Sequence, residues 1–483
     1  MKTVIHWFRR DLRLTDNTAL NAAGKAGDQI VPVFVLSEWK GPHRWVGPNR
    51  QEFLCACLAS LAGDLEAVGG RLIIRSGPAE RELEKLVKET GAEAIFYNLD
   101  PDPFGRGVET RLADVAQRLG VKLFASQDVA IHAGDEVLTG SEQTYRVFSP
   151  YFKAWEKLPK QAVGPRLTQV HTPPDIKSLP LPDLSHWKLK SEGAKIIEAG
   201  EKAARGRLAS FVKAQGAIKR YAEGRTELTG PTTSRFSQDL RWGLLSAREI
   251  YHRCREVAGL LDAKGQDSVQ KFISEIAWRD FYFQILFHYP NILDEDFSPA
   301  TRGLPWKEAK DHEEEFKRWC EGTTGFPIVD AGMRQLSATG YMHNRLRMIV
   351  AMFLTKDLRV YWRDGEAFFM RKLVCGDIAS NNGGWQWSAG TGADAAPYFR
   401  VQNPWTQSER FDPKGEFIKE WVPELRDVPA KRFNAPPEGK GGLAKGYPPP
   451  MLDHPTARDE TLEMFKAHRA YAATGKTELR EVE

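Results

Sequence analysis

The run from Cys375 to Pro404, CGDIASNNGGWQWSAGTGADAAPYFRVQNP, constrains this chain more than any other stretch. It places two amides, Asn381 and Asn382, beside a glycine pair and two tryptophans that are one residue apart. Glycine has no Cβ, so the backbone there can approach a ligand closely. Indole rings offer flat surfaces with an N–H donor, and amides both donate and accept hydrogen bonds. The mixture suits a planar ligand with polar edges, although the glycine pair alone would also fit a turn before a core helix.

Composition describes an ordinary globular protein that is long enough for two or three domains. A net charge of +4 does not indicate a nucleic-acid-binding protein, so any basic surface must be local. Five cysteines form neither a paired framework nor a metal-ligand spacing, which predicts a reducing compartment and no metal site. The N-terminus is not a signal peptide, and no apolar stretch is long enough to cross a bilayer. We therefore expect a soluble, cytoplasmic protein.

Residues 1–130 alternate short apolar runs with amphipathic segments, the pattern of a parallel α/β sheet. We expect strands at 3–7, 30–35, 72–74, 94–97 and 122–124, with helices near 50–68, 79–90 and 107–119. FRRDLR follows the first strand, so the G-x-G-x-x-G fingerprint of dinucleotide binding is absent there. The arginines of this loop would fit a solvated surface.

Beyond residue 130 the pattern changes twice. From 131 to 200 the periodicity fades, and six prolines between residues 159 and 182 mark an extended interdomain linker. Residues 201–472 show helical patterns almost throughout, which predicts an all-α C-terminal domain, and 473–483 form a short polar tail. Eight of the fourteen tryptophans lie between Trp278 and Trp421. Core packing would explain several of them, and an aromatic electron-transfer chain would also require this density.

Three stretches carry a resemblance to a known family. The Cys375–Pro404 run resembles the flavin-contacting signature of the photolyase/cryptochrome family. TGFPIVDAGMRQLSATGYMHNRLRMIVAMFLTKDL at 324–358 resembles the core of that family, and WFRRDLRLTDN at 7–17 its N-terminal domain. The resemblance covers nearly the entire chain and is closest to class I cyclobutane pyrimidine dimer photolyases. It implies a Rossmann-like antenna domain followed by a helical domain that binds FAD.

The resemblance also implies a set of residues that contact the flavin. They are Tyr221, Thr233, Ser234, Arg235, Phe236, Ser237, Arg347, Asp377 and Asn381. The TTSR run offers hydroxyls, backbone N–H groups and a guanidinium where a helix is expected to start, which suits a diphosphate. An ordinary Ser/Thr cap would have the same composition. Asn381 matches the residue that faces the flavin N5, where an amide supports the active, fully reduced FADH⁻.

SEIAWRDFY places Glu275, Trp278 and Arg279 on one helix face, at i, i+3 and i+4. The resemblance implies that the Trp278 ring stacks on a lesion while the Glu275 carboxyl hydrogen-bonds to thymine carbonyl oxygens. The alternative is a salt bridge within the helix between Glu275 and Arg279. Arg225, Arg279, Arg345, Trp387 and Arg400 match other positions that contact DNA, together with Trp278.

YMHNRLRM places Asn344, Arg347 and Met348 on another helix face. Relatives that repair (6-4) photoproducts carry histidines at the positions of Asn344 and Met348, because their chemistry needs a general acid. An amide and a thioether at these positions resemble cyclobutane-dimer photolyases, whose substrate opens after receiving one electron.

Trp385, Trp362 and Trp306 match the proximal, middle and distal members of the family's electron relay. Trp319 is a competing candidate, although core packing explains it better. We expect the relay to reduce oxidised flavin from the surface inward.

Two positions depart from the family pattern. Cys375 stands where close relatives carry an aspartate that pairs with the residue equivalent to Arg347, which leaves Arg347 to another anion such as Asp377 or the flavin diphosphate. Gly105 and Arg106 stand where folate-binding relatives carry Asn-Glu. The second, antenna chromophore therefore stays open between a folate, a deazaflavin, another flavin and none.

The resemblance implies light-dependent DNA repair by a carbon–carbon lyase. Blue-light-excited FADH⁻ would donate an electron to a flipped-out cyclobutane pyrimidine dimer, which splits into two pyrimidines. The expected partner is UV-damaged DNA, bound by a monomer that associates with the nucleoid and not with a membrane. A cryptochrome-like photoreceptor is the main alternative, and Asn381, the Glu275–Trp278 pair and the short tail argue against it. A flavoprotein of thermal redox metabolism would need a nicotinamide fingerprint.

Overall fold

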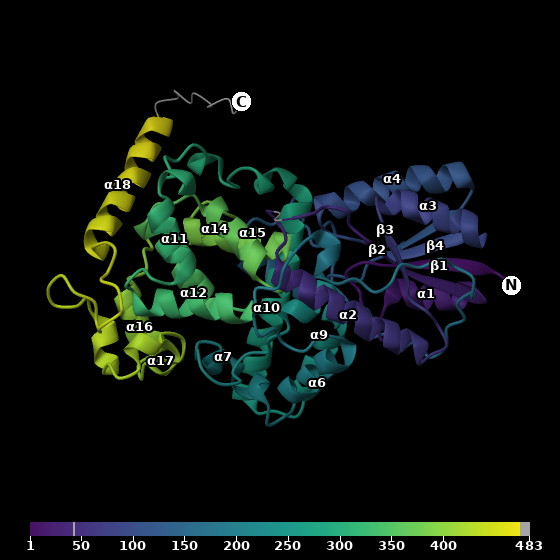
Figure 1. Cartoon of the computed structure of the whole chain (residues 1–483), viewed down its shortest axis with the longest axis horizontal. Helices are drawn as coiled ribbons and strands as arrows, with labels where there is room; N and C mark the ends of the chain where they lie inside the picture. Colours follow the sequence, from purple (N-terminus) through teal and green to yellow (C-terminus); the bar gives the residue numbers. More distant parts are fainter. Residues whose placement is uncertain (42–43, 474–483) are drawn as a thin grey trace.

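The computed structural model describes residues 1–41 and 44–473. The chain passes from an α/β part that holds the N-terminus to a helical part that ends in α18 (His454–Ala473) at the opposite end of the molecule (Figure 1). The tail predicted at 473–483 lies, from residue 474 onward, outside the described residues.

Five strands form one parallel sheet with the order β3-β2-β1-β4-β5. They are β1 (Thr3–Phe8), β2 (Gln29–Leu36), β3 (Ile73–Ser76), β4 (Ala94–Asn98) and β5 (Lys122–Ser126). All five predicted strands are confirmed. Every residue of β1 and β4 is buried. Both strands are covered on both faces, which explains why their sequences are continuous apolar runs. The edge strand β5 is largely exposed, in keeping with its more polar sequence.

Four helices accompany the sheet: α1 (Thr18–Ala26), α2 (Pro48–Glu66), α3 (Ala79–Thr90) and α4 (Pro103–Leu119). The three predicted helices are confirmed as α2, α3 and α4. The sequence patterns missed α1, a helix of nine residues that follows directly on the first loop. Its N-cap is Asn17, whose side chain accepts a hydrogen bond from the Leu20 amide.

The segment 131–200 is mostly irregular but contains α5 (Phe148–Lys157) and a 3₁₀ turn at Leu184–Trp187. The prediction of an extended linker is therefore wrong for α5, whose first turn includes Pro150, a residue that is tolerated at a helix start. Tyr151 and Trp155 of α5 are buried against the helical part of the molecule. The segment thus packs as part of the fold.

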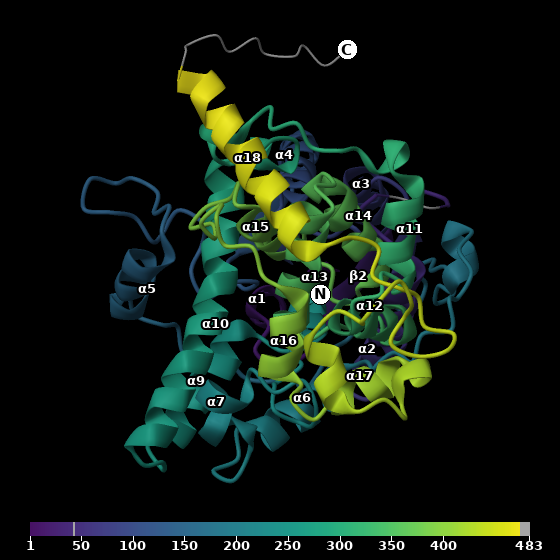
Figure 2. The same ribbon diagram turned by 90° about the vertical axis from the view of Figure 1, so that its left-hand side faces the viewer.

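The predicted all-α C-terminal part is confirmed. Its helices are α6 (Glu201–Phe211), α7 (Tyr221–Gly224), α8 (Ser237–Trp242), α9 (Ala247–Ala258), α10 (Ala263–His288), α11 (Glu313–Glu321), α12 (Pro327–Thr339), α13 (Asn344–Met352), α14 (Trp362–Lys372), α15 (Ile378–Ala389), α16 (Pro404–Phe411), α17 (Glu416–Trp421) and α18. Helix α10, with 26 residues, runs through this part and packs against α5, α7, α9 and α15 (Figure 2).

The two parts of the chain share a hydrophobic core. One buried cluster extends from Phe8 in β1 through Leu58 in α2 to Phe272 and Phe281 in α10. The loop before α2 also meets the end of α14 backbone to backbone: a Cβ on Gly47 would lie 1.8 Å from the carbonyl oxygen of Arg371. Only glycine permits this approach, so the α/β part is fixed directly onto the helices that carry the site.

Candidate functional site

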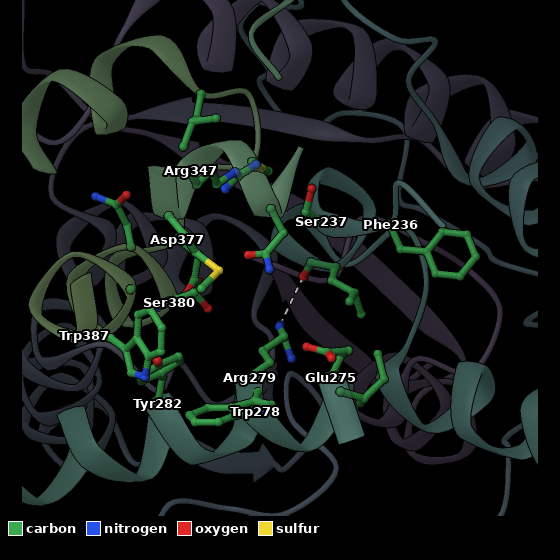
Figure 3. A pocket seen from close by; sticks show the side chains of 18 of the residues that line it. Phe236, Ser237, Glu275, Trp278, Arg279, Tyr282, Arg347, Asp377, Ser380 and Trp387 are labelled. Atoms are coloured by element: carbon green, nitrogen blue, oxygen red, sulfur yellow. Dashed lines mark hydrogen bonds between the residues drawn. The ribbon is translucent and has the colours of Figure 1, made fainter. Parts of the chain in front are cut away.

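A cavity of about 570 Å³ opens in the helical part between α10 on one side and α13 and α15 on the other. This volume is typical of small-molecule and cofactor pockets. Figure 3 shows Glu275 and Trp278 of α10 at one side of the cavity, Arg347 at the opposite side, and Asp377, Ser380 and Trp387 of the α15 region beside them.

Most of the predicted site residues line this one cavity. They are Tyr221, Arg225, Ser234, Phe236, Ser237, Glu275, Trp278, Arg279, Asn344, Arg345, Arg347, Met348, Asp377, Asn381, Trp385 and Trp387. The five that do not line it are Thr233, Arg235, Trp306, Trp362 and Arg400. Arg235 instead stacks over the Tyr341 ring at 4.1 Å and lines a small second cavity with Cys375, while Arg400 is exposed. Residues as far apart in sequence as Tyr221 and Trp387 therefore converge as the resemblance implied.

Helix α15 contains the Asn-Asn-Gly-Gly-Trp run, so the alternative of a glycine-rich turn is wrong. Asp377 begins the helix as its N-cap and accepts a hydrogen bond from the Ser380 amide at 3.0 Å. A Cβ on Gly383 would lie 2.1 Å from the Tyr282 ring, whereas one on Gly384 would meet nothing within 4 Å. Gly383 thus lets α10 and α15 approach each other, and Gly384 leaves room in the cavity.

The orientation of Asn381 is set from α14. Its amide nitrogen donates to the carbonyl oxygen of Glu366 at 3.1 Å, and Asn382 donates to the Glu366 carboxylate at 2.9 Å. With its nitrogen engaged, Asn381, which lines the cavity, keeps its amide oxygen as an acceptor. That oxygen suits a ligand N–H such as the N5 position of a reduced flavin.

A buried ion cluster joins Asp377 to the α/β part. Arg10, in the loop after β1, pairs with Asp377 and also with Asp100 at 3.2 Å and Asp102 at 3.3 Å, in the loop after β4. These two loops meet where the strand order of the sheet reverses, the usual ligand-binding edge of such sheets. Burial alone would raise the pKa of Asp377, but Arg10 and neighbouring arginines outweigh it and hold the pKa well below its ordinary value. The loop arginines are therefore not solvated.

Arg347 does not pair with Asp377, which Arg10 already occupies. The Arg347 Nε donates to the Met342 carbonyl at 2.9 Å, and its Nη2 lies 3.3 Å from the Sγ of Cys375. The expectation that Asp377 replaces the missing aspartate is therefore wrong. A buried thiol, not a carboxylate, faces this guanidinium at the cavity wall.

At the cavity mouth Glu275 pairs with Arg225 at 2.9 Å and with Lys271 at 3.4 Å. The alternative of a Glu275–Arg279 salt bridge is wrong, because Arg279 points toward the α/β part. It donates to the carbonyl oxygens of Val129 at 2.6 Å and Leu240 at 3.2 Å. Glu275 therefore stays at the mouth, on a face of α10 that solvent and ligands reach.

The three tryptophans that are predicted to form the relay lie at and behind the cavity wall. Trp385 forms part of this wall, and Trp362 is fully buried on α14. Gly365, one turn after Trp362, touches the Trp385 ring so closely that a Cβ there would lie 2.1 Å away. Trp306 stacks on Tyr361 at 6.5 Å, and Tyr361 lies 5.7 Å from Trp362. The competing candidate Trp319 is also close, with its ring 6.0 Å from that of Trp385.

Sequence reasoning missed several lining residues, among them Arg241, Lys271 and Tyr282. Helical spacing could have found two of them, since Arg241 lies four residues after Ser237 and Tyr282 four after Trp278. The buried Nε and Nη1 of Arg241 have no hydrogen-bond partner among the described residues. Unpaired guanidinium donors at the wall, with serine hydroxyls and aromatic faces beside them, fit an anionic planar ligand such as a flavin dinucleotide.

Residues 1–41 and 44–473 contain neither a candidate metal site nor a candidate membrane-spanning helix. They contain no cluster of three or more histidine, cysteine or acidic side chains arranged to hold a metal ion. No helix there combines the length and apolar character that crossing a bilayer requires.

Comparison with known proteins identifies close relatives. Residues 272–467 match the family model described as the FAD binding domain of DNA photolyase, and residues 4–173 the model described as DNA photolyase. The deoxyribodipyrimidine photo-lyase of Agrobacterium fabrum is 39% identical over 98% of each chain. A class III photolyase structure from Agrobacterium tumefaciens superposes with a TM-score of 0.89 at 36% identity, covering 97% of this chain and 98% of that one.

An archaeal photolyase from Sulfolobus tokodaii, whose structure holds two FAD molecules, superposes with a TM-score of 0.82 at 30% identity. The match covers 96% of this chain and all of that one. The predicted family is confirmed by these findings. The finer assignment to class I stays a prediction.

Proposed function

Because the chain belongs to the photolyase/cryptochrome family, we propose that it repairs UV-damaged DNA by splitting cyclobutane pyrimidine dimers under blue light, with FAD as its cofactor. The observation that carries this proposal is the single cavity that unites two groups of residues. Asn381 and Trp385 on α15 form the flavin side, and Glu275 and Trp278 on α10 form the lesion side at the mouth. A flipped-out dimer entering the mouth would lie directly against a flavin held inside.

The flavin side would be held by hydroxyl, aromatic and guanidinium groups of α7, α8 and α13. Ser234, Ser237 and Arg347 would engage the diphosphate, Tyr221 and Phe236 would pack beside it, and Asn381 would accept from the ring. Bound FAD supplies light absorption and one-electron transfer. The residues of the cavity wall would hold FAD close to the mouth.

The lesion side would bind the dimer without needing a proton donor. Trp278 offers a ring for stacking, and the Glu275 carboxyl offers hydrogen bonds to the pyrimidine edge. Arg225, Arg345 and Arg400 would hold phosphates without reading sequence. Extrusion of the dimer costs a few kcal/mol, and least for a badly stacked lesion, which favours damaged sites.

A second chromophore would extend light capture. The relative that holds two FAD molecules supports a flavin antenna. A folate is less well supported. A Cβ added to Gly105 would lie 2.5 Å from the Asp100 side chain, so this position has no room for a larger residue, and the Arg106 guanidinium stacks on the Phe287 ring at 4.0 Å. These side chains replace the Asn-Glu pair of folate-binding relatives. The partner of the whole protein would be damaged DNA, and the protein would bind it as a monomer inside the cell.

The test is a repair assay on an oligonucleotide that carries one thymine dimer. Purified protein with reduced FAD should restore intact thymines under blue light and do nothing in the dark. A protein that binds FAD and responds to light but leaves the dimer intact would contradict the proposal and favour a photoreceptor.

A further inference from the structure

The middle tryptophan of the relay has a buried carboxylate as its hydrogen-bond partner. Trp362 is inaccessible to solvent, and its Nε1 donates to the Oδ1 of Asp296 at 2.8 Å. Asp296 is itself 4% exposed. An indole N–H needs only a neutral acceptor such as a carbonyl or hydroxyl, so a buried carboxylate in this place costs desolvation that packing alone does not explain.

The position of Asp296 is fixed by α15, the helix that carries Trp385. Gln386, the residue after Trp385, accepts from the Phe297 amide at 2.8 Å and so holds the segment on which Asp296 lies. The Ser298 amide donates to the Thr391 carbonyl at 2.9 Å just beyond the helix. The carboxylate is therefore held against Trp362 by the same element that forms the cavity wall.

No cation neutralises the Asp296 carboxylate among the ion pairs of the described residues. Arg302, the nearest guanidinium, donates through Nε to the Asp296 backbone oxygen and pairs through Nη1 with Glu295 at 3.1 Å. The other groups that face Asp296 are the carboxylate of Glu295, the hydroxyl of Thr301 and the phenol of Tyr361. Burial raises the pKa of Asp296 to about 6, although the hydrogen bond from Trp362 opposes the shift.

The chemistry of indole gives this contact a consequence. A neutral indole holds its N–H proton firmly, but an indole that has lost an electron is a far stronger acid at that nitrogen. We propose that Asp296 is the proton acceptor of Trp362 when light drives an electron from Trp362 toward the flavin. This inference rests on the proposed function, because the light-excited oxidised flavin is the oxidant.

The step balances in atoms and electrons. One electron leaves Trp362 and reduces the oxidised Trp385. The Nε1–H bond of Trp362 breaks, an O–H bond forms on Asp296, and a neutral Trp362 radical faces a carboxylic acid. An electron donor from solution later reduces the radical, directly or through Trp306, and the proton returns to nitrogen. Proton transfer thus keeps Trp362 in its oxidised form and slows the return of the electron from the flavin.

Flash photolysis of the FAD-loaded protein tests the inference, since the visible spectra of protonated and neutral tryptophan radicals differ. In the wild type the protonated radical should convert to the neutral one with a solvent deuterium isotope effect. Asp296→Asn retains the acceptor oxygen but cannot take a proton, so the protonated radical should live about 10²-fold longer, the lower range for a positioned acid–base group. Glu295→Gln is the matched control, measured well above pH 6. It removes a neighbouring carboxylate that pairs with Arg302 and raises the pKa of Asp296, but Asp296 stays ionised at that pH, so the kinetics should equal those of the wild type.

A second measurement needs no photochemistry. The indole N–H resonance of Trp362, assigned with Trp362→Phe, should shift as pH falls through about 6 in the wild type and stay constant in Asp296→Asn. Because Asp296 is protonated below that pH, the wild-type radical should then behave like that of the variant.

Equal radical kinetics in wild type and Asp296→Asn would overturn the inference, and so would a Trp362 resonance that ignores the substitution. Absence of any tryptophan radical in the wild type would overturn it together with the relay. Dimer repair by the chemically reduced enzyme would show in that case that the proposed function still stands.

Discussion

The indole ring of Trp278 lies parallel to the phenyl ring of Phe148, with 3.8 Å between centroids and 9° between planes. Phe148 begins α5, within the segment that the sequence predicts as linker. Trp278 also lines the cavity, so the face that Phe148 leaves uncovered is the one open to a ligand. The 131–200 segment therefore supports the ring that we expect to stack on the lesion.

We predict that Trp278→Ala weakens binding to dimer-containing DNA by about 1–3 kcal/mol, the usual contribution of base–aromatic stacking. Affinity for undamaged DNA should change little, because phosphate contacts dominate it. Fluorescence anisotropy on matched damaged and undamaged oligonucleotides measures both. Phe148→Leu is the control: it removes the supporting ring while keeping an apolar side chain, and should cost less. Equal weakening toward both DNAs would assign Trp278 to packing alone.

Lesion choice is the second prediction. Asn344 and Met348 both line the cavity, and neither an amide nor a thioether is a general acid. The enzyme should therefore repair cyclobutane dimers and leave (6-4) photoproducts unchanged. Illumination of DNA that carries both lesions, followed by chromatography of the digested nucleosides, measures this directly. Efficient reversal of (6-4) photoproducts would refute the assignment of these two residues.

Local patterns predicted the five strands, three helices of the α/β part and the helical character of residues 201–472, because each strand or helix is a continuous apolar run or an amphipathic repeat. Helix α3, bounded by Ala79 and Thr90, ends where it was predicted. α1 and α5 escaped because each is short, with nine and ten residues, and Pro150 lies in the first turn of α5. Most of the residues that line the cavity could be predicted from the resemblance and from helical spacing, as for Glu275 and Trp278.

Partners that lie far apart in sequence could not be predicted. Arg10 and Asp377 are separated by 367 residues, and nothing near either residue indicates the other. Arg279 also fits a salt bridge within α10, yet its guanidinium turns to the Val129 and Leu240 carbonyls, which lie outside that helix. Such choices depend on tertiary packing, which periodicity does not encode.

The Arg10–Asp377 pair gives the third prediction. Arg10→Met should lower the free energy of unfolding by about 3–5 kcal/mol, because it leaves buried carboxylates without their cation. It should also loosen the N-cap of α15 and weaken FAD retention. Denaturation with and without added FAD measures both effects. A variant as stable as the wild type would show that Arg241 and Arg279 alone compensate Asp377.

The same pair predicts a pH dependence. The folded-state pKa of Asp377 is depressed, so its stabilising contribution is present above the ordinary carboxyl pKa of 3.8 and is lost as pH falls below it. The stability gap between wild type and Asp377→Asn should therefore be largest near neutral pH and shrink in acid. The loss in acid lies below the pH at which Asp102 titrates, since burial raises the pKa of Asp102 to about 6. A gap that does not change with pH would contradict the ion pair.

The fourth prediction concerns the relay. Electron hopping needs aromatic donors in near contact, and Trp385 is the relay member at the cavity wall, so its loss should interrupt every route that passes through it. Trp385→Phe should abolish photoreduction of oxidised FAD while FAD stays bound. Chemically reduced Trp385→Phe should still repair dimers, because the repair electron comes from the flavin. Absorbance under illumination measures the first outcome, and the dimer assay the second.

Variants behind Trp385 identify the route. Trp362→Phe should also lose photoreduction, whereas Trp319→Phe should retain it and lose stability, since the buried Trp319 indole donates to the Val350 carbonyl at 3.0 Å. The 6.0 Å contact between Trp319 and Trp385 makes this comparison decisive. If Trp319→Phe blocks photoreduction and Trp362→Phe does not, electrons enter through α11 instead of α14. Wild-type photoreduction in Trp385→Phe would exclude both routes, because each reaches the flavin through that ring.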